Sequence, residues 1–366
     1  MSQPTTERHS TGRAALREWG LGLRDMRSWI GLVAIYVLLT WLISELTGLQ
    51  EFYRLLLYPA RSLTAAVVSL LLIFVGYVIY LPLVAREPRP LKRIWRLVET
   101  YLLAPRQIMN LLVPLLLMPF FMSAFTSFKS MIPEIVPFYL DPAFMSADRL
   151  LHFGWHPFEI THALFGGQTA SLVINTFYHV WFLVMWAAMI WHLIHLAERA
   201  HRLQFLLSFI LTWTLLGSLA ALALSSAGPV YYGEVTGLAD PFGPLMSRLY
   251  EIDATARLAG ATGGLPVLEV QEMLWGFYTD QDTTYGSGIS AMPSLHVAVT
   301  ALIAMSAYRI HRLFGYVMWA FTAIMLVGSV HLAWHYAIDG YVAIAATAVI
   351  WRLTGRFAER EVARNG

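Results

Sequence analysis

Three histidines and one aspartate in the C-terminal part of the chain have types and spacing that could do chemistry. His331, His335 and Asp339 follow one another at intervals of four residues, which places neighbouring members on one face of a helix. A carboxylate beside an imidazole fixes its tautomer and leaves the other ring nitrogen free to attack. The spacing therefore predicts a nucleophilic histidine with an orienting acid, and His296 is expected to exchange protons beside it.

Two other interpretations of the same residues remain open. Two histidines separated by four residues are a common ligand spacing, so His331, His335 and Asp339 are also a candidate metal site. The chain contains no His-Glu-x-x-His motif. The third interpretation is a structural network of buried polar groups without catalytic function.

The segment Ser290–His296 predicts a helix end that binds phosphate. Pro293 suits the first position of a helix, and the N–H groups that follow it would then be unpaired donors at the positive end of the helix dipole. Ser294 adds a hydroxyl donor, and His296 can give or take a proton beside a bound anion. The alternative is an ordinary capped helix that happens to contain a histidine.

Composition places these residues in a membrane protein. The chain has 366 residues, of which 57% are hydrophobic and 13% charged, with a mean hydropathy of +0.57. Soluble globular proteins have about 45–50% apolar and about 25% charged residues. A formal net charge of +2 excludes a nucleic-acid-binding protein, and the hydrophobicity excludes disorder. The absence of Cys excludes disulfides, thiolate metal sites and cysteine nucleophiles.

We therefore expect an all-α, polytopic bundle of about eight transmembrane helices, since a bilayer core needs roughly 20 apolar residues per helix. The expected spans are residues 29–48, 63–85, 108–128, 169–193, 204–226, 293–309, 314–334 and 337–354. Residues 1–28 have no apolar run, so we expect the first span to act as a signal-anchor. Two long loops, 129–168 and 227–291, lie between spans.

The distribution of charge predicts the orientation of these spans. With the N-terminus inside, the inner segments contain most of the 25 Lys and Arg residues, including the block Arg86–Arg106. Cytoplasmic loops carry such an excess of cations. Both termini are therefore expected in the cytoplasm, and the loops 129–168 and 227–291 on the outer side. His296, His335 and Asp339 then meet at the outer boundary of the membrane, where ionisable groups are functional candidates.

Two motifs make the sequence similar to a known family. Pro293-Ser-Leu-His296, followed by His335-x-x-x-Asp339, resembles the second and third signature motifs of the type 2 phosphatidic acid phosphatase superfamily. The longer form Ser-x-Met-Pro-Ser-Leu-His is more similar to the inositol phosphorylceramide synthase-like branch, which belongs to sphingolipid metabolism. The resemblance covers residues 125–350.

A further stretch is similar to bacterial members of that branch. It comprises Phe128–Pro133, Asp141-Pro142 and Asp148–Gly154. The resemblance implies a bacterial-type inner or plasma membrane and a six-helix catalytic core within residues 108–354. Residues 29–107 are then two additional transmembrane helices with a basic inner loop. Residues 1–28 and 355–366 are expected as cytoplasmic segments.

The resemblance also implies a mechanism with no metal and no cofactor. His335 would attack phosphorus, oriented by Asp339, and form a phosphohistidine. His296 would protonate the leaving oxygen and then deprotonate the incoming water or alcohol, because one residue can act as acid and then as base.

Two positions depart from the superfamily pattern. The third motif normally opens with Ser-Arg, where this chain has Gly328 and Ser329. The first motif is expected at Leu224–Pro229, which contains no cation. Since phosphoryl transfer requires its negative charge to be neutralised, we expect Lys129 and a protonated His331 to bind substrate together with Ser294. Further candidates are Arg149, Arg248 and Arg257. The interpretation of Lys129 as an ordinary interfacial lysine stays open.

The fourth expected span contains three polar side chains in its outer half. These are Asn175, Tyr178 and His179. They lie on one helical stretch and are placed to line a cavity. The alternative is a hydrogen bond between helices, which is common in membrane proteins.

Three functions follow as hypotheses. The first is a membrane phosphotransferase that takes a head group from a phospholipid or polyprenyl-phosphate donor and gives it to a lipid or polyol alcohol. The second is a phosphatase of lipid or polyprenyl phosphates or diphosphates, with water as acceptor. The third, a proton-coupled lipid transporter, would use the His/Asp cluster as a proton relay. No inverted repeat supports it.

Overall fold

The structure is a computed structural model that describes residues 5–59, 71, 74–83, 85–102, 104–194, 198–260 and 263–365. All regular elements in this part of the chain are helices, which confirms the prediction of an all-α fold. Six helices are long and apolar enough to cross a membrane, as expected of a multi-pass membrane protein. Two shorter apolar helices, Phe74–Leu83 and Leu295–Ile310, accompany them.

All expected spans except the second correspond to described helices. In chain order these are α1 (Thr5–Thr47), α4 (Pro105–Ile135), α7 (Gln168–Ile194), α8 (Arg199–Thr214), α13 (Leu295–Ile310), α14 (Arg312–His331) and α15 (Ala337–Asn365). Much of the second span, 63–85, lies outside the described residues. The helices α1 and α15 also extend through most of the two terminal segments that were expected to flank the bundle.

Helix α4 is longer than the hydropathy pattern predicted. The span was expected to end at residue 128, but the helix continues to Ile135. Its last turns are buried because Phe128, Met131 and Ile132 pack in one apolar cluster with Phe52. Residues 129–135 therefore belong to the bundle and not to the following loop.

The fifth span is not a regular α-helix throughout. After α8 the chain continues as the π-helix η2 (Leu215–Ala220) and the short helix α9 (Ala221–Ala223). Gly217 allows a close approach here, because a Cβ atom at this position would lie 2.6 Å from the Leu295 side chain. Tyr36 of α1 and Ser218 share a hydrogen bond of 2.8 Å. The π-helix η2 thus packs between α1 and the start of α13. Single π-helical turns of this kind are frequent at functional sites.

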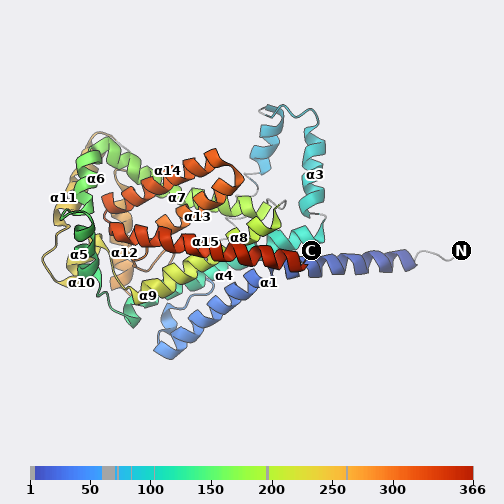
Figure 1. The fold of residues 1–366 in the computed structure, drawn as a ribbon, viewed down its shortest axis with the longest axis horizontal. Helices are drawn as coiled ribbons and strands as arrows, with labels where there is room; N and C mark the ends of the chain where they lie inside the picture. The colour runs from blue at the N-terminus through green and yellow to red at the C-terminus, as the bar shows by residue number, and fades with distance from the viewer. Residues whose placement is uncertain are drawn as a thin grey trace.

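The two long loops fold into short helices at one end of the bundle, as Figure 1 shows. These are α5 (Asp141–Leu151), α6 (Pro157–Phe165), η3 (Pro229–Tyr231), α10 (Tyr232–Thr236), α11 (Gly243–Leu258) and α12 (Pro266–Thr279). Helix α15 begins beside this layer and ends at the opposite end of the bundle, beyond which the first turns of α1 extend (Figure 1). Helix α3 (Pro90–Leu102) lies apart from the bundle (Figure 1). The layer of short helices therefore covers the bundle end from which α15 starts.

Candidate active site

His335 and Asp339 form a buried pair where the turn after α14 meets α15. Asp339 lies in the first turn of α15, but His335 precedes the helix, so the prediction of one shared helical face was wrong. The Nδ1 atom of His335 lies 3.2 Å from Oδ2 of Asp339, and the backbone N–H of Tyr336 donates to the same oxygen over 3.1 Å. The Asp339 side chain is fully buried. Since Nδ1 is engaged, Nε2 of His335 is the ring nitrogen available for another group.

His296 approaches this pair from a different helix. The ring centroids of His296 and His335 are 6.3 Å apart, with an angle of 60° between the planes. The two segments also touch through their backbones, because the N–H of Ser294 donates to the carbonyl oxygen of Asp339 over 3.3 Å. The structure thus brings together three of the residues selected from the sequence.

An aromatic wall from α7 surrounds the His296 ring. Tyr178 stacks on it with a centroid distance of 4.8 Å, and Trp181 lies at 4.3 Å. The indole N–H of Trp181 donates to the His296 carbonyl over 3.0 Å, and Phe182 meets the ring edge-on. Sequence analysis selected Tyr178 but missed Trp181 and Phe182. Their spacing of three and four residues from Tyr178 was the available signal.

The helix end at the Pro-Ser-Leu-His motif begins later than expected. Pro293 was predicted as the first helical residue, but α13 begins at Leu295 and Ser294 is its N-cap. The Ser294 hydroxyl accepts from the Val297 N–H at 3.5 Å, the bond that favours serine at this position. The N–H groups of Leu295 and His296 donate to no other group in the described chain. They are free to bind an oxyanion.

Lys129 lies in α4 close to this helix end. Its side chain is partly buried. The loop before the motif packs directly on it, because a Cβ atom on Gly288 would lie 2.8 Å from the Lys129 carbonyl carbon. A hydrogen bond of 2.9 Å between Ser130 and Ser287 fixes the same contact.

The other candidate cations are engaged elsewhere. Arg149, Arg248 and Arg257 each bind an oxygen within their own helix or the turn that follows it. Ser329, which stands in place of the missing motif arginine, uses its carbonyl oxygen to accept the N–H of His335 at 3.1 Å. Lys129 therefore stays the first candidate among the cations selected from the sequence.

His331 is buried against α6 and α7. Its Nε2 atom lies 2.9 Å from the Ser171 hydroxyl, and its ring stacks on His162 with centroids 3.8 Å apart. Burial lowers the pKa of His162. These contacts bind the His331 ring to Ser171 and His162 and not to the His335–Asp339 pair. In the described part of the chain no three His, Asp or Glu residues are grouped as metal ligands.

Two aspartates of α5 hold the segment that carries His335 and Asp339. The carboxylate of Asp148 is 3% exposed and accepts the N–H groups of Ala337 at 2.7 Å and Ile338 at 2.9 Å. These are the first two residues of α15, whose N–H groups have no partner within the helix. Asp148, which belongs to α5, thus caps the N-terminus of α15. The second residue that it binds, Ile338, directly precedes Asp339.

Asp141 supports the same segment from its other side. Its carboxylate accepts the N–H groups of Ala227 and Gly228 at 2.9 and 2.8 Å and the Tyr336 hydroxyl at 2.9 Å. Burial raises the pKa of both Asp141 and Asp148, while these hydrogen bonds act to lower it. Sequence analysis noted both aspartates only within the bacterial resemblance. Their partners lie between 86 and 195 residues away, so no local pattern reveals the contacts.

The turn before His335 is also fixed from the loop 227–291. Gly228 has a φ of +97°, and a Cβ atom on it would lie 2.6 Å from the carbonyl oxygen of Trp334. Val230 and Gln271 donate to the two carbonyl groups that precede Trp334, over 3.0 and 2.8 Å. Residues of the loops 129–168 and 227–291 therefore hold the His335 turn in place from two sides.

Comparison with known proteins covers the same part of the chain. A family model described as the PAP2 superfamily matches residues 142–353, which is more than half of the sequence. The matched region contains His296, His335 and Asp339 but neither Lys129 nor α1. No curated protein and no solved structure matches the chain.

The cap at Asp148 predicts a specific loss of stability. In Asp148→Asn the amide keeps the shape but offers one acceptor oxygen where two N–H groups need partners. Leaving a buried donor unpaired costs about 1–3 kcal/mol, so we expect the melting temperature in detergent to fall by about 2–8 °C. Glu251→Gln, the same chemical change at an exposed carboxylate paired with Arg248, is the control and should melt like the wild type. An unchanged melting temperature for Asp148→Asn would show that the cap contributes nothing.

Proposed function

The chain belongs to the PAP2 superfamily, and from this premise we propose that it is a lipid phosphotransferase with His296, His335 and Asp339 as its catalytic residues. Membership and the long apolar helices support an enzyme of phosphatase or phosphotransferase type that acts on lipid phosphates within a membrane. The finer proposal rests on one observation. The His296 ring on α13 and the His335 ring in the turn before α15 approach to 6.3 Å, and His335 is bound to a buried carboxylate.

In the first step Nε2 of His335 attacks the phosphorus of the donor lipid. The new N–P bond forms as the bond between phosphorus and the leaving oxygen breaks, and His296 supplies the proton that this oxygen needs. Asp339, bound to Nδ1 at 3.2 Å, holds the ring in the required tautomer and stabilises its positive charge. The separation of 6.3 Å between the two ring centroids supports these roles, because both rings can then contact one phosphoryl group.

In the second step His296 acts in reverse. It removes the proton from an alcohol or a water molecule, whose oxygen attacks phosphorus and breaks the N–P bond. An alcohol acceptor completes a transfer, and water completes a hydrolysis. The two reactions therefore use the same residues and differ only in which oxygen reaches His296.

The charge near the site favours a substrate with little negative charge. The free N–H groups of Leu295 and His296 and the ammonium group of Lys129 can bind the equatorial oxygens. This set has fewer cations than phosphoryl transfer normally uses. A phosphodiester carries less negative charge than a phosphomonoester. We therefore propose transfer between diesters, as in the inositol phosphorylceramide synthase-like branch that the Ser290–His296 motif resembles, ahead of monoester hydrolysis.

A direct test identifies the products. Purified protein is incubated with a pool of phospholipids, ceramide and polyprenyl phosphates, and the lipids are analysed by mass spectrometry. We expect a new head-group ester in the wild-type reaction. His335→Ala and Asp339→Asn should form it at least about a thousandfold more slowly while remaining folded. Release of inorganic phosphate alone would replace the transfer with hydrolysis, and an active His335→Ala enzyme would exclude the proposed nucleophile.

The acid role of His296 predicts a dependence on the leaving group. In His296→Ala the leaving oxygen must depart without a proton, which matters less when the leaving group is intrinsically good. We expect the rate loss to be about 10²–10⁴-fold with an alkyl alcohol leaving group and much smaller with a nitrophenol. The first-order rate of donor cleavage measures this. Equal losses with both leaving groups would remove His296 from the acid role.

A mechanism based on two imidazoles also predicts insensitivity to chelators. Incubation with EDTA followed by desalting should leave the rate of transfer unchanged, because no step requires a bound metal ion. A parallel sample that receives zinc after desalting serves as the comparison. Activity that is lost with EDTA and regained with zinc would instead favour the metal site of His331, His335 and Asp339.

A further inference from the structure

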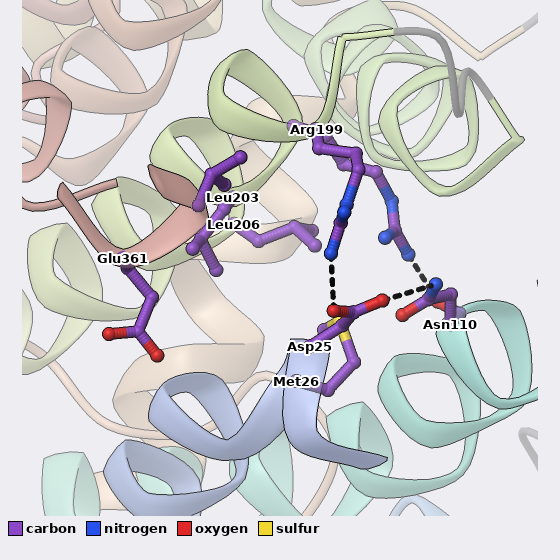
Figure 2. A pocket seen from close by; sticks show the side chains of 9 residues that line it. Asp25, Met26, Asn110, Arg199, Leu203, Leu206 and Glu361 are labelled. Carbon is purple, nitrogen blue, oxygen red and sulfur yellow. Dashed lines mark hydrogen bonds and ion pairs between the residues drawn. The ribbon is translucent and has the colours of Figure 1, made fainter. Parts of the chain in front are cut away.

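A polar cavity lies between α1, α4 and α8, far from the candidate active site. It has a volume of about 90 Å³. Figure 2 shows a neighbouring pocket that shares residues with it, in which Asp25 lies between Arg199 and Asn110. The walls of the polar cavity are formed by Asp25, Arg106, Gln107, Asn110, Arg199 and Arg202. Along α4, Arg106 and Lys129 are separated by roughly 35 Å at the rise of an α-helix. We refer to it as the basic cavity.

The charges of the basic cavity do not balance. Asp25 accepts two hydrogen bonds from Arg106, at 2.7 and 3.0 Å, and one from Arg199. The nearby Glu361 is paired with Arg27 at 2.7 Å. Arg202 is only 7% exposed, and in the described residues it forms no ion pair and donates to two carbonyl oxygens. Because guanidinium groups stay protonated, the cavity has an excess of positive charge, which is costly when buried.

Asn110 gives an independent indication of a ligand. Its side chain is 5% exposed and lines the cavity. The amide nitrogen donates to Asp25 at 3.5 Å, but the buried Oδ1 atom has no hydrogen-bond partner. Buried polar atoms normally have one, so this oxygen is placed to accept from a bound group.

The backbone around the basic cavity also favours an anion. Helix α4 begins at Pro105 and α8 at Arg199, so Arg106, Gln107 and Arg202 all lie in first helical turns. The positive ends of two helix dipoles therefore add to the guanidinium charges. The space is several times the ~10–15 Å³ that one water needs, which leaves room for a larger group.

We propose that the basic cavity binds the phosphate of an anionic lipid head group or a free phosphate ion. Basic pockets between transmembrane helices bind acidic lipid head groups in this way. Arg199 is 38% exposed, which leaves the cavity open to its surroundings. The bound phosphate would neutralise Arg202 and bridge α1 to α4 and α8. Its role is to attach α1, which lies outside the region matched by the family model, to the catalytic part of the chain.

The test measures the melting temperature of the full chain in detergent at constant ionic strength. Phosphatidylglycerol is titrated as mixed micelles in the first arm and phosphatidylcholine, as the lipid without net charge, in the second. Inorganic phosphate is titrated in the third arm. A saturable rise with phosphatidylglycerol alone identifies a lipid head group, and a rise with inorganic phosphate identifies the free ion as a sufficient ligand. The absence of a rise with both phosphatidylglycerol and inorganic phosphate overturns the proposal, and so does an equal rise with phosphatidylcholine. The rise should persist in His335→Ala, because the candidate active site is at the other end.

Two variants separate binding from mere structure. Arg199→Gln and Asp25→Asn both break the same ion pair, but the first removes a positive charge and the second a negative one. We expect Arg199→Gln to raise the half-saturating ligand concentration at least about tenfold and Asp25→Asn to lower it. Arg356→Gln, at an exposed position of α15, is the matched control and should leave it unchanged. Equal weakening in Arg199→Gln and Asp25→Asn, or in Arg356→Gln, would overturn the proposal.

Discussion

The capping of α15 by the Asp148 carboxylate is the interaction on which the candidate site depends most. It fixes the first turn of the helix that contains Asp339, and Asp141 fixes the preceding turn through Tyr336. Both carboxylates are buried, where hydrogen bonds are strong and an unpaired polar group is costly. The layer of short helices at this end of the bundle (Figure 1) therefore holds the segment that contains His335 and Asp339.

Contacts to the side chain and the backbone explain how a helix bundle can hold an imidazole in one orientation. Side chains at the ends of transmembrane helices are normally free to adopt several rotamers, but His335 is bound at Nδ1 and its backbone N–H is bound to Ser329. His296 is restricted by the aromatic wall of α7. Two rings that are fixed independently can keep a constant separation, which is what pre-organised acid–base catalysis requires.

The fold class and most spans followed from the sequence, because a bilayer imposes a length of apolar residues that hydropathy detects directly. The same reasoning put His296 beside the His335–Asp339 pair, since antiparallel spans return to the same boundary. It could not reveal the extension of α4 to Ile135, which depends on packing with Phe52. Nor could it find the cap at Asp148, because its partners Ala337 and Ile338 are distant in the sequence. The preference of proline for the first helical position wrongly predicted that the helix begins at Pro293. The helix α13 begins at Leu295 because Ser294 is its N-cap.

The central claim is that His335 becomes covalently bound to phosphorus, and trapping that intermediate tests it most directly. A donor phospholipid with an isotopically labelled phosphate is mixed with excess enzyme, the reaction is quenched in alkali within milliseconds, and the labelled peptide is identified by mass spectrometry. The account predicts a label that survives alkali, is lost in acid and lies on the peptide that contains His335. Turnover without any protein-bound label, or a label on another residue, would contradict it.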